Sequence, residues 1–135
     1  MQDIRDAVQI GLAVDPSWGK IDADRGNCYA AAVHTARALT LGGVVAVVVH
    51  GAPVYRGPGG GRMGHAWVEV EVDGRVWVVD YSNRLREVLP VSLYYRIGQI
   101  EPARCVRYDV GEAIDLALET GEYGPWTPFE DVLMG

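Results

Sequence analysis

The sequence predicts an α+β domain in which a cysteine-bearing helix packs on an antiparallel sheet. Three β-branched segments follow one another with no helical pattern between them, and such consecutive strands favour antiparallel pairing. They span 44–50, 65–72 and 75–81. Helical patterns precede and follow this block, so we expect the helices on one side of the sheet. The 135 residues suit one compact domain, expected to span 1–135.

Two helices are predicted in the N-terminal part of the chain. The first falls within 2–14, where apolar residues recur at helical spacing. The second spans 28–41 and is rich in alanine, with Asn27 before it as a favourable N-cap. The two glycines at 42–43 end this helix. Cys28 is therefore predicted to be the first residue of a helix.

The other elements follow from shorter patterns. The continuous β-branched run 44–50 predicts a buried strand, and the glycine-rich segment 51–64 predicts a loop. The pattern of 84–103 is mixed and predicts no regular element. Another strand is expected within 104–110, and a short helix over 112–120.

A hairpin brings two polar residues together. Apolar and other residues alternate over 65–72, and Asp73 and Gly74 then form the strongest short hairpin signal. With a two-residue turn, His65 and Asp80 lie on the same face as diagonal neighbours, with Cα atoms about 7–8 Å apart. A register shifted by one residue would place them on opposite faces. The predicted contact therefore depends on the turn.

Cys28, His65 and Asp80 are the parts of a thiol triad. Unpaired N–H groups and the positive end of the helix dipole favour a thiolate at a helix N-terminus. A histidine can serve as base, and a carboxylate can fix its tautomer and orientation. Taken singly, each residue also has a structural interpretation: a packed thiol, a core histidine and a strand-end cap. We expect both cysteines, Cys28 and Cys105, to be reduced.

Three segments resemble the signatures of the transglutaminase-like branch of the papain-like cysteine superfamily. They are G-N-C-Y-A-A-A at 26–32, G-H-A-W-V-E-V at 64–70 and V-V-D-Y-S at 78–82. The wider set of motifs also resembles small proteins of phage and bacterial genomes. The resemblance implies a papain/transglutaminase-like core with Cys28 as nucleophile, His65 as base and Asp80 as the orienting carboxylate. It further implies hydrolysis of an amide or ester, or acyl transfer, through a thioester.

Acyl transfer also requires donors for the charged oxygen of the tetrahedral intermediate. The backbone N–H of Cys28 is one candidate. Further candidates are Asn27, Trp18 and Tyr29, whose alternative roles are a helix cap and core packing. Trp67 is among the aromatic residues that could line a substrate groove. Arg62, in the glycine-rich loop, could contact a substrate carboxylate or phosphate, or could be solvated.

Charge and spacing exclude several classes of partner. The net charge is −6, and the residues after Arg107 include seven acidic and no basic ones, which gives no footprint for nucleic acid or an anionic membrane. The candidate ligands lack paired metal-binding spacing, so no metal and no cofactor is expected. The start of the chain lacks the pattern of a secretory signal, and no apolar run is long enough to span a membrane, so we expect a cytoplasmic protein.

The sequence therefore predicts a cysteine-dependent hydrolase, peptidase or transglutaminase-like acyltransferase acting on a peptide or another amide. The alternative is a catalytically silent binding module of the same fold that engages a host or partner protein. Thiol reactivity at Cys28 distinguishes the two. A third interpretation, a cysteine-ligated metal protein, predicts stoichiometric metal after purification. The pattern leaves the substrate and the oligomeric state open.

Overall fold

A five-stranded antiparallel sheet organises the computed structural model, which describes residues 4–14, 28–54, 61–81 and 87–126. The strand order is β4-β3-β2-β1-β5. The strands are β1 (Ala46–Gly51), β2 (His65–Val72), β3 (Arg75–Asp80), β4 (Glu87–Pro90) and β5 (Val106–Asp109). The helices are α1 (Ile4–Val14), α2 (Cys28–Leu41), α3 (Val91–Ile97), the 3₁₀ turn η2 (Pro102–Arg104) and α4 (Val110–Thr120). The predicted α+β class and the packing of the cysteine-bearing helix on an antiparallel sheet are confirmed.

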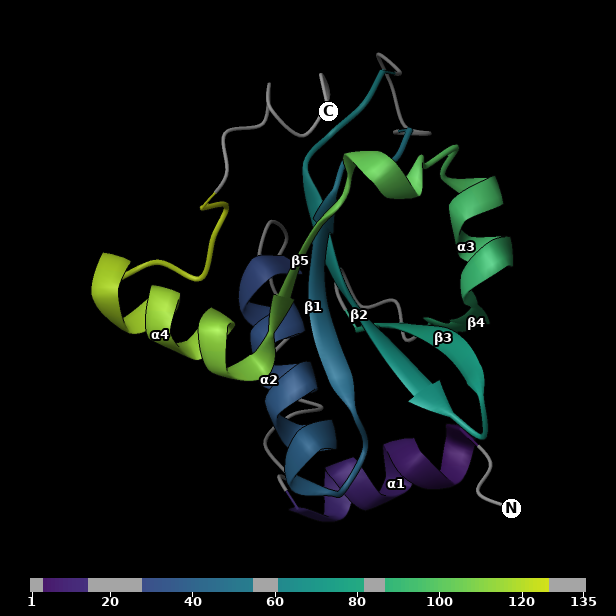
Figure 1. Ribbon diagram of the computed structural model, residues 1–135, viewed down its shortest axis with the longest axis vertical. Helices are drawn as coiled ribbons and strands as arrows, with labels where there is room; N and C mark the ends of the chain where they lie inside the picture. The colour runs from purple at the N-terminus through teal and green to yellow at the C-terminus, as the bar shows by residue number, and fades with distance from the viewer. Residues whose placement is uncertain (1–3, 15–27, 55–60, 82–86, 127–135) are drawn as a thin grey trace.

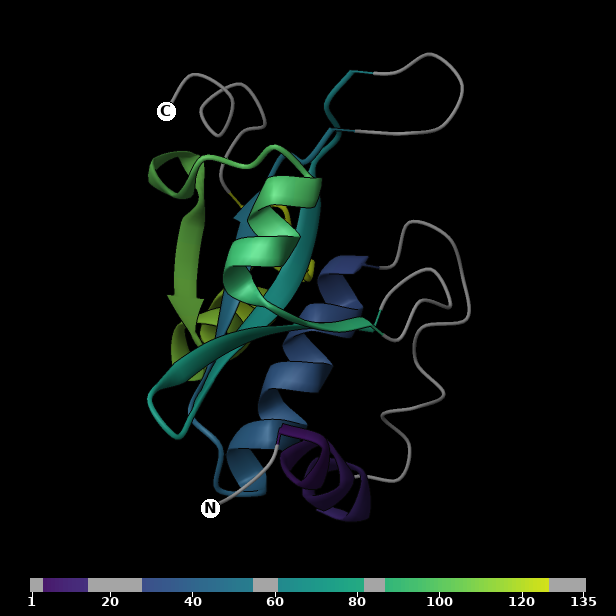
Figure 2. The same ribbon diagram turned by 90° about the vertical axis from the view of Figure 1, so that its right-hand side faces the viewer.

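Helices cover both faces of the sheet, so the expectation of helices on one side is wrong. In Figure 1, α2 and α4 lie to the left of the sheet, α3 lies to its right, and α1 packs below against α2. Figure 2, turned by 90°, shows α3 in front of the strands. The segment 84–103, for which no element was predicted, contains β4, α3 and η2. Each of these is too short for a clear hydrophobic period.

The β2–β3 hairpin has the predicted two-residue turn. Asp73 and Gly74 have φ values of 53° and 77°, the positive pair that a type I′ turn requires. Val72 therefore pairs with Arg75, and the register continues to Val68 opposite Val79. This register places the side chains of His65, at the start of β2, and Asp80, at the end of β3, on the same face of the sheet, as predicted.

The C-terminus of α2 explains why β1 begins two residues later than predicted. Gly43 has a φ of 91°, and the N–H of Val44 donates to the carbonyl of Leu39 at 2.9 Å. Val44 therefore completes the helix end and is not free to join the sheet. The helix α4 begins earlier than the predicted range 112–120, because Asp109 and Glu112 form a reciprocal capping box at its N-terminus.

Two apolar cores lie on opposite faces of the sheet. The larger one joins alanine and valine side chains of α2 to Val48, Val68 and Val70, and includes Ile4 and Val8 of α1. The smaller one lies under α3 and is largely aromatic; its buried members are Val49, Trp67, Val78, Tyr94, Tyr95 and Ile100. Among the residues that the structure describes, no helix has the length and apolar character that crossing a membrane would need.

Gly51→Ala should destabilise the fold. A Cβ at this position would lie 2.5 Å from the ring of Trp67 and 3.2 Å from the sulfur of Cys105. Overpacking of this kind costs about 1–3 kcal/mol of unfolding free energy. Urea denaturation measures the change. The matched control is Gly111→Ala, whose Cβ meets only an ordinary contact at 3.4 Å in a helix. It should leave stability unchanged or raise it by up to about 1 kcal/mol. Equal stability of the two variants would contradict the predicted close packing at Gly51.

Candidate active site

His65 and Asp80 form a part-buried hydrogen bond where β2 begins and β3 ends. His65 Nε2 lies 2.8 Å from Asp80 Oδ2. Asp80 is only 4% exposed, so its charge depends on such partners. The bond confirms the predicted placement of the two side chains on one face. It also commits Nε2 and leaves Nδ1 of the imidazole for another partner.

Cys28 also interacts with this imidazole. It is the first residue of α2 and is buried, with a free thiol. Burial alone lowers the pKa of His65, but hydrogen bonds to Asp80 and Cys28, together with their charges, raise it to about 10. The structure therefore brings the three predicted triad residues together in the order Cys28, His65, Asp80. Such a line places a histidine where it can take the proton of a thiol.

Asp80 has further neighbours that the sequence did not predict. The hydroxyl of Tyr94, on α3, donates to Asp80 Oδ2 at 2.7 Å. Glu87 of β4 lies directly opposite Asp80 in the register. Burial and then the charge of Asp80 raise the pKa of Glu87, while His65 opposes this shift. The pair of adjacent tyrosines at 94–95 was the available signal, since a buried tyrosine hydroxyl needs a partner.

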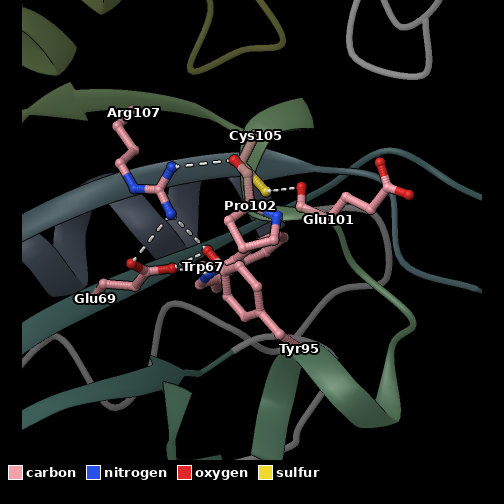
Figure 3. Close-up of polar contacts among 7 residues, drawn as sticks. All are labelled: Trp67, Glu69, Tyr95, Glu101, Pro102, Cys105 and Arg107. Atoms are coloured by element: carbon pink, nitrogen blue, oxygen red, sulfur yellow. Dashed lines mark hydrogen bonds and ion pairs between the residues drawn. The ribbon is translucent and has the colours of Figure 1, made fainter. Parts of the chain in front are cut away.

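A second polar cluster lies behind the site, under α3. It consists of Trp67, Glu69, Tyr95 and Arg107, and Figure 3 shows its contacts. The buried carboxylate of Glu69 accepts from Trp67 Nε1 at 3.0 Å and from the Tyr95 hydroxyl. Arg107 donates to that hydroxyl at 2.9 Å and lies 3.6 Å from Glu69 Oε1. The cluster joins β2, α3 and β5 and fixes the indole of Trp67.

Trp67 is a wall beside the histidine. Its side chain is 1% exposed, and its ring stacks on His65 with centroids 6.1 Å apart. Its only ring donor is committed to Glu69. Trp67 thus shields the imidazole on one side, and it is too deeply buried to line an open groove.

His50 is a second buried imidazole near the site, with an opposite environment. It is 2% exposed, among the rings of Tyr29, Tyr108 and Trp126. Neither ring nitrogen has a hydrogen-bond partner in the described part of the chain. Burial, and then the charge of His65, lower the pKa of His50 to about 4. This histidine is therefore neutral at physiological pH.

The remaining residues that the sequence proposed for the site lie in different surroundings. Tyr29 is half-buried and edge-on to His50; burial, and then Cys28, raise its pKa to about 12. Arg62 is exposed and donates to the carbonyl of Ala52 at 2.8 Å, which ties the two ends of its loop together. Asn27 and Trp18 lie outside the described residues.

Searches of family models, curated proteins and solved structures find no match to this chain. Within 4–14, 28–54, 61–81 and 87–126, no group of three or more histidine, cysteine or carboxylate side chains is arranged to hold a metal ion. The interpretation of the site therefore rests on its own geometry.

His65 and His50 should titrate at widely separated pH values. In an NMR titration of the ring carbons, His65 should lose its proton near pH 10, and His50 should gain one only near pH 4. Asp80→Asn removes a charge and a hydrogen bond that raise the pKa of His65, so it should lower that pKa. Titration of His65 near its ordinary value of 6.5 in the wild-type protein would contradict the triad.

The raised pKa of His65 also predicts how the stability of the fold depends on pH. A raised folded-state pKa means that His65 contributes stability fully below pH 6.5 and loses it as the pH rises toward about 10. Unfolding free energies measured from pH 6.5 to 10 should therefore fall more steeply for the wild-type protein than for Asp80→Asn. Parallel curves for the two proteins would show that the ion pair adds no stability.

Proposed function

We propose that this protein is a cysteine-dependent hydrolase or acyltransferase that acts on an amide through a thioester. The observation that carries the proposal is the position of His65, which bonds Asp80 through Nε2 at 2.8 Å and contacts Cys28 at the start of α2. A nucleophile, a base and a group that orients the base are the parts this chemistry needs. The earlier resemblance to the transglutaminase-like branch of the papain-like superfamily points the same way.

The reaction follows from this arrangement. The sulfur of Cys28 attacks the substrate carbonyl, and its proton resides on His65 Nδ1. The backbone N–H of Cys28 is the natural donor to the developing oxyanion. As the C–N bond breaks, His65 gives its proton to the leaving amine, and the acyl group remains on sulfur. Water or a second amine then attacks the thioester, with His65 removing its proton, and the thiol is released.

Asp80 holds the imidazole through both steps. Its bond to Nε2 fixes the tautomer in which Nδ1 faces sulfur, and its charge stabilises the imidazolium. Trp67 excludes water from one face of the ring. We expect a peptide or another amide-containing substrate, and a cytoplasmic protein.

An activated ester tests this function without knowledge of the natural substrate. Incubation with p-nitrophenyl acetate should release p-nitrophenolate and leave an acetyl group on Cys28, detected by peptide mass mapping. Cys28→Ala should abolish both signals while the fold persists. His65→Ala should slow acylation by about 100-fold, as expected for loss of a general base. Asp80→Asn should slow it less than Cys28→Ala does.

Cys105→Ala is the matched control. Cys105 is half-buried, and burial raises the pKa of its thiol, so it should react slowly and its removal should leave acylation of Cys28 intact. Acylation of Cys105 at the same rate as Cys28, or normal p-nitrophenolate release by Cys28→Ala, would overturn the proposed function. A slow, ordinary thiol at Cys28 would instead favour a catalytically silent binding module.

A further inference from the structure

One oxygen of Asp80 serves two donors. His65 Nε2 lies 2.8 Å from Oδ2, and the Tyr94 hydroxyl donates to the same atom at 2.7 Å. Tyr94 is buried on α3, and Asp80 is buried at the end of β3. Two hydrogen bonds on a single oxygen compete for the same negative charge, so each one weakens the other.

We infer that Tyr94 is a positioning residue that sets how strongly Asp80 holds the imidazolium of His65. The inference rests on the proposed function, because it concerns the same triad. A second donor disperses the charge of the carboxylate and reduces its pull on the ring. His65 then keeps enough acidity to protonate a leaving amine. The same bond fixes the rotation of the carboxylate, and so the direction in which Nδ1 points.

The surroundings allow Tyr94 to act only as a donor. Burial, followed by the charge of Asp80 and the bond to it, raises the pKa of Tyr94, so the hydroxyl keeps its proton across the working pH range. Among the described residues, the other titratable groups that interact with the His65–Asp80 pair include Cys28 from α2, His50 from β1 and Glu87 from β4. Glu87 lies opposite Asp80 in the register, and its negative charge repels that of Asp80. A hydrogen bond from Tyr94 to Oδ2 helps to offset this repulsion.

Tyr95 provides a matched control in the same helix. It is also buried, and its hydroxyl also donates to a buried carboxylate, but that carboxylate is Glu69 in the second polar cluster. Both tyrosines therefore hold α3 on the sheet by the same chemistry. Only Tyr94 touches the triad.

The test compares Tyr94→Phe with Tyr95→Phe, each of which removes one hydroxyl and keeps the ring. In Tyr94→Phe, Asp80 becomes a stronger acceptor, so the pKa of His65 measured by NMR should rise by about half a unit to one unit, the size expected for one hydrogen bond to a charged group. Tyr95→Phe should leave it within about 0.2 units. The alkaline limb of the pH profile for acylation of Cys28 by p-nitrophenyl acetate, where His65 loses its proton, should move to higher pH only in Tyr94→Phe.

A stronger hydrogen-bond donor at position 94 should shift the pKa of His65 in the opposite direction. Placing 3-fluorotyrosine at position 94 makes the hydroxyl more acidic and keeps the bond, so the pKa of His65 should fall. This second variant preserves the contact if Tyr94→Phe does not fold. An unchanged pKa of His65 in both variants, or an equal change in Tyr95→Phe, would overturn the inference. The titration needs no substrate, so absence of acylation in the wild-type protein would overturn the proposed function alone.

Discussion

A carboxylate almost fully removed from water has to be held by hydrogen bonds, and the rest of the site depends on how Asp80 meets this requirement. Its Oδ2 accepts from His65 on the neighbouring strand and from Tyr94 on α3. The first bond orients an imidazole toward Cys28, and the second ties α3 to the sheet. Two neighbouring strands and a helix therefore converge on a single oxygen atom.

His65 and His50 show how neighbouring groups decide the protonation state of a histidine. His65 and His50 lie on neighbouring strands, and both are largely withdrawn from water. His65 has a carboxylate and a thiol beside it and is held as a cation, with a pKa of about 10. His50 is packed among aromatic rings, has neither kind of partner within the described residues, and is held neutral. Burial opposes the charge at both positions, and only at His65 do partners outweigh it.

The triad could be predicted from sequence because local rules fix it. The Asp73–Gly74 turn sets the register of the hairpin, and the register sets which side chains meet. The helix that begins at Cys28 could likewise be read from its alanine-rich pattern and the glycines that end it. By contrast, α3 is a seven-residue helix that owes its place to tertiary contacts, including the bonds of Tyr94 and Tyr95 to carboxylates on distant strands. No local sequence pattern indicates such contacts, so the sequence did not predict that α3 covers the second face of the sheet.

The central claim is that His65 activates the thiol of Cys28. The most direct measurement is the rate of alkylation by iodoacetamide as a function of pH, with peptide mass mapping to separate Cys28 from Cys105. The account predicts fast labelling of Cys28 that persists to pH values at which Cys105 no longer reacts, and that slows strongly in His65→Ala. Slow labelling of Cys28, with the same pH profile as Cys105 and no response to His65→Ala, would contradict it.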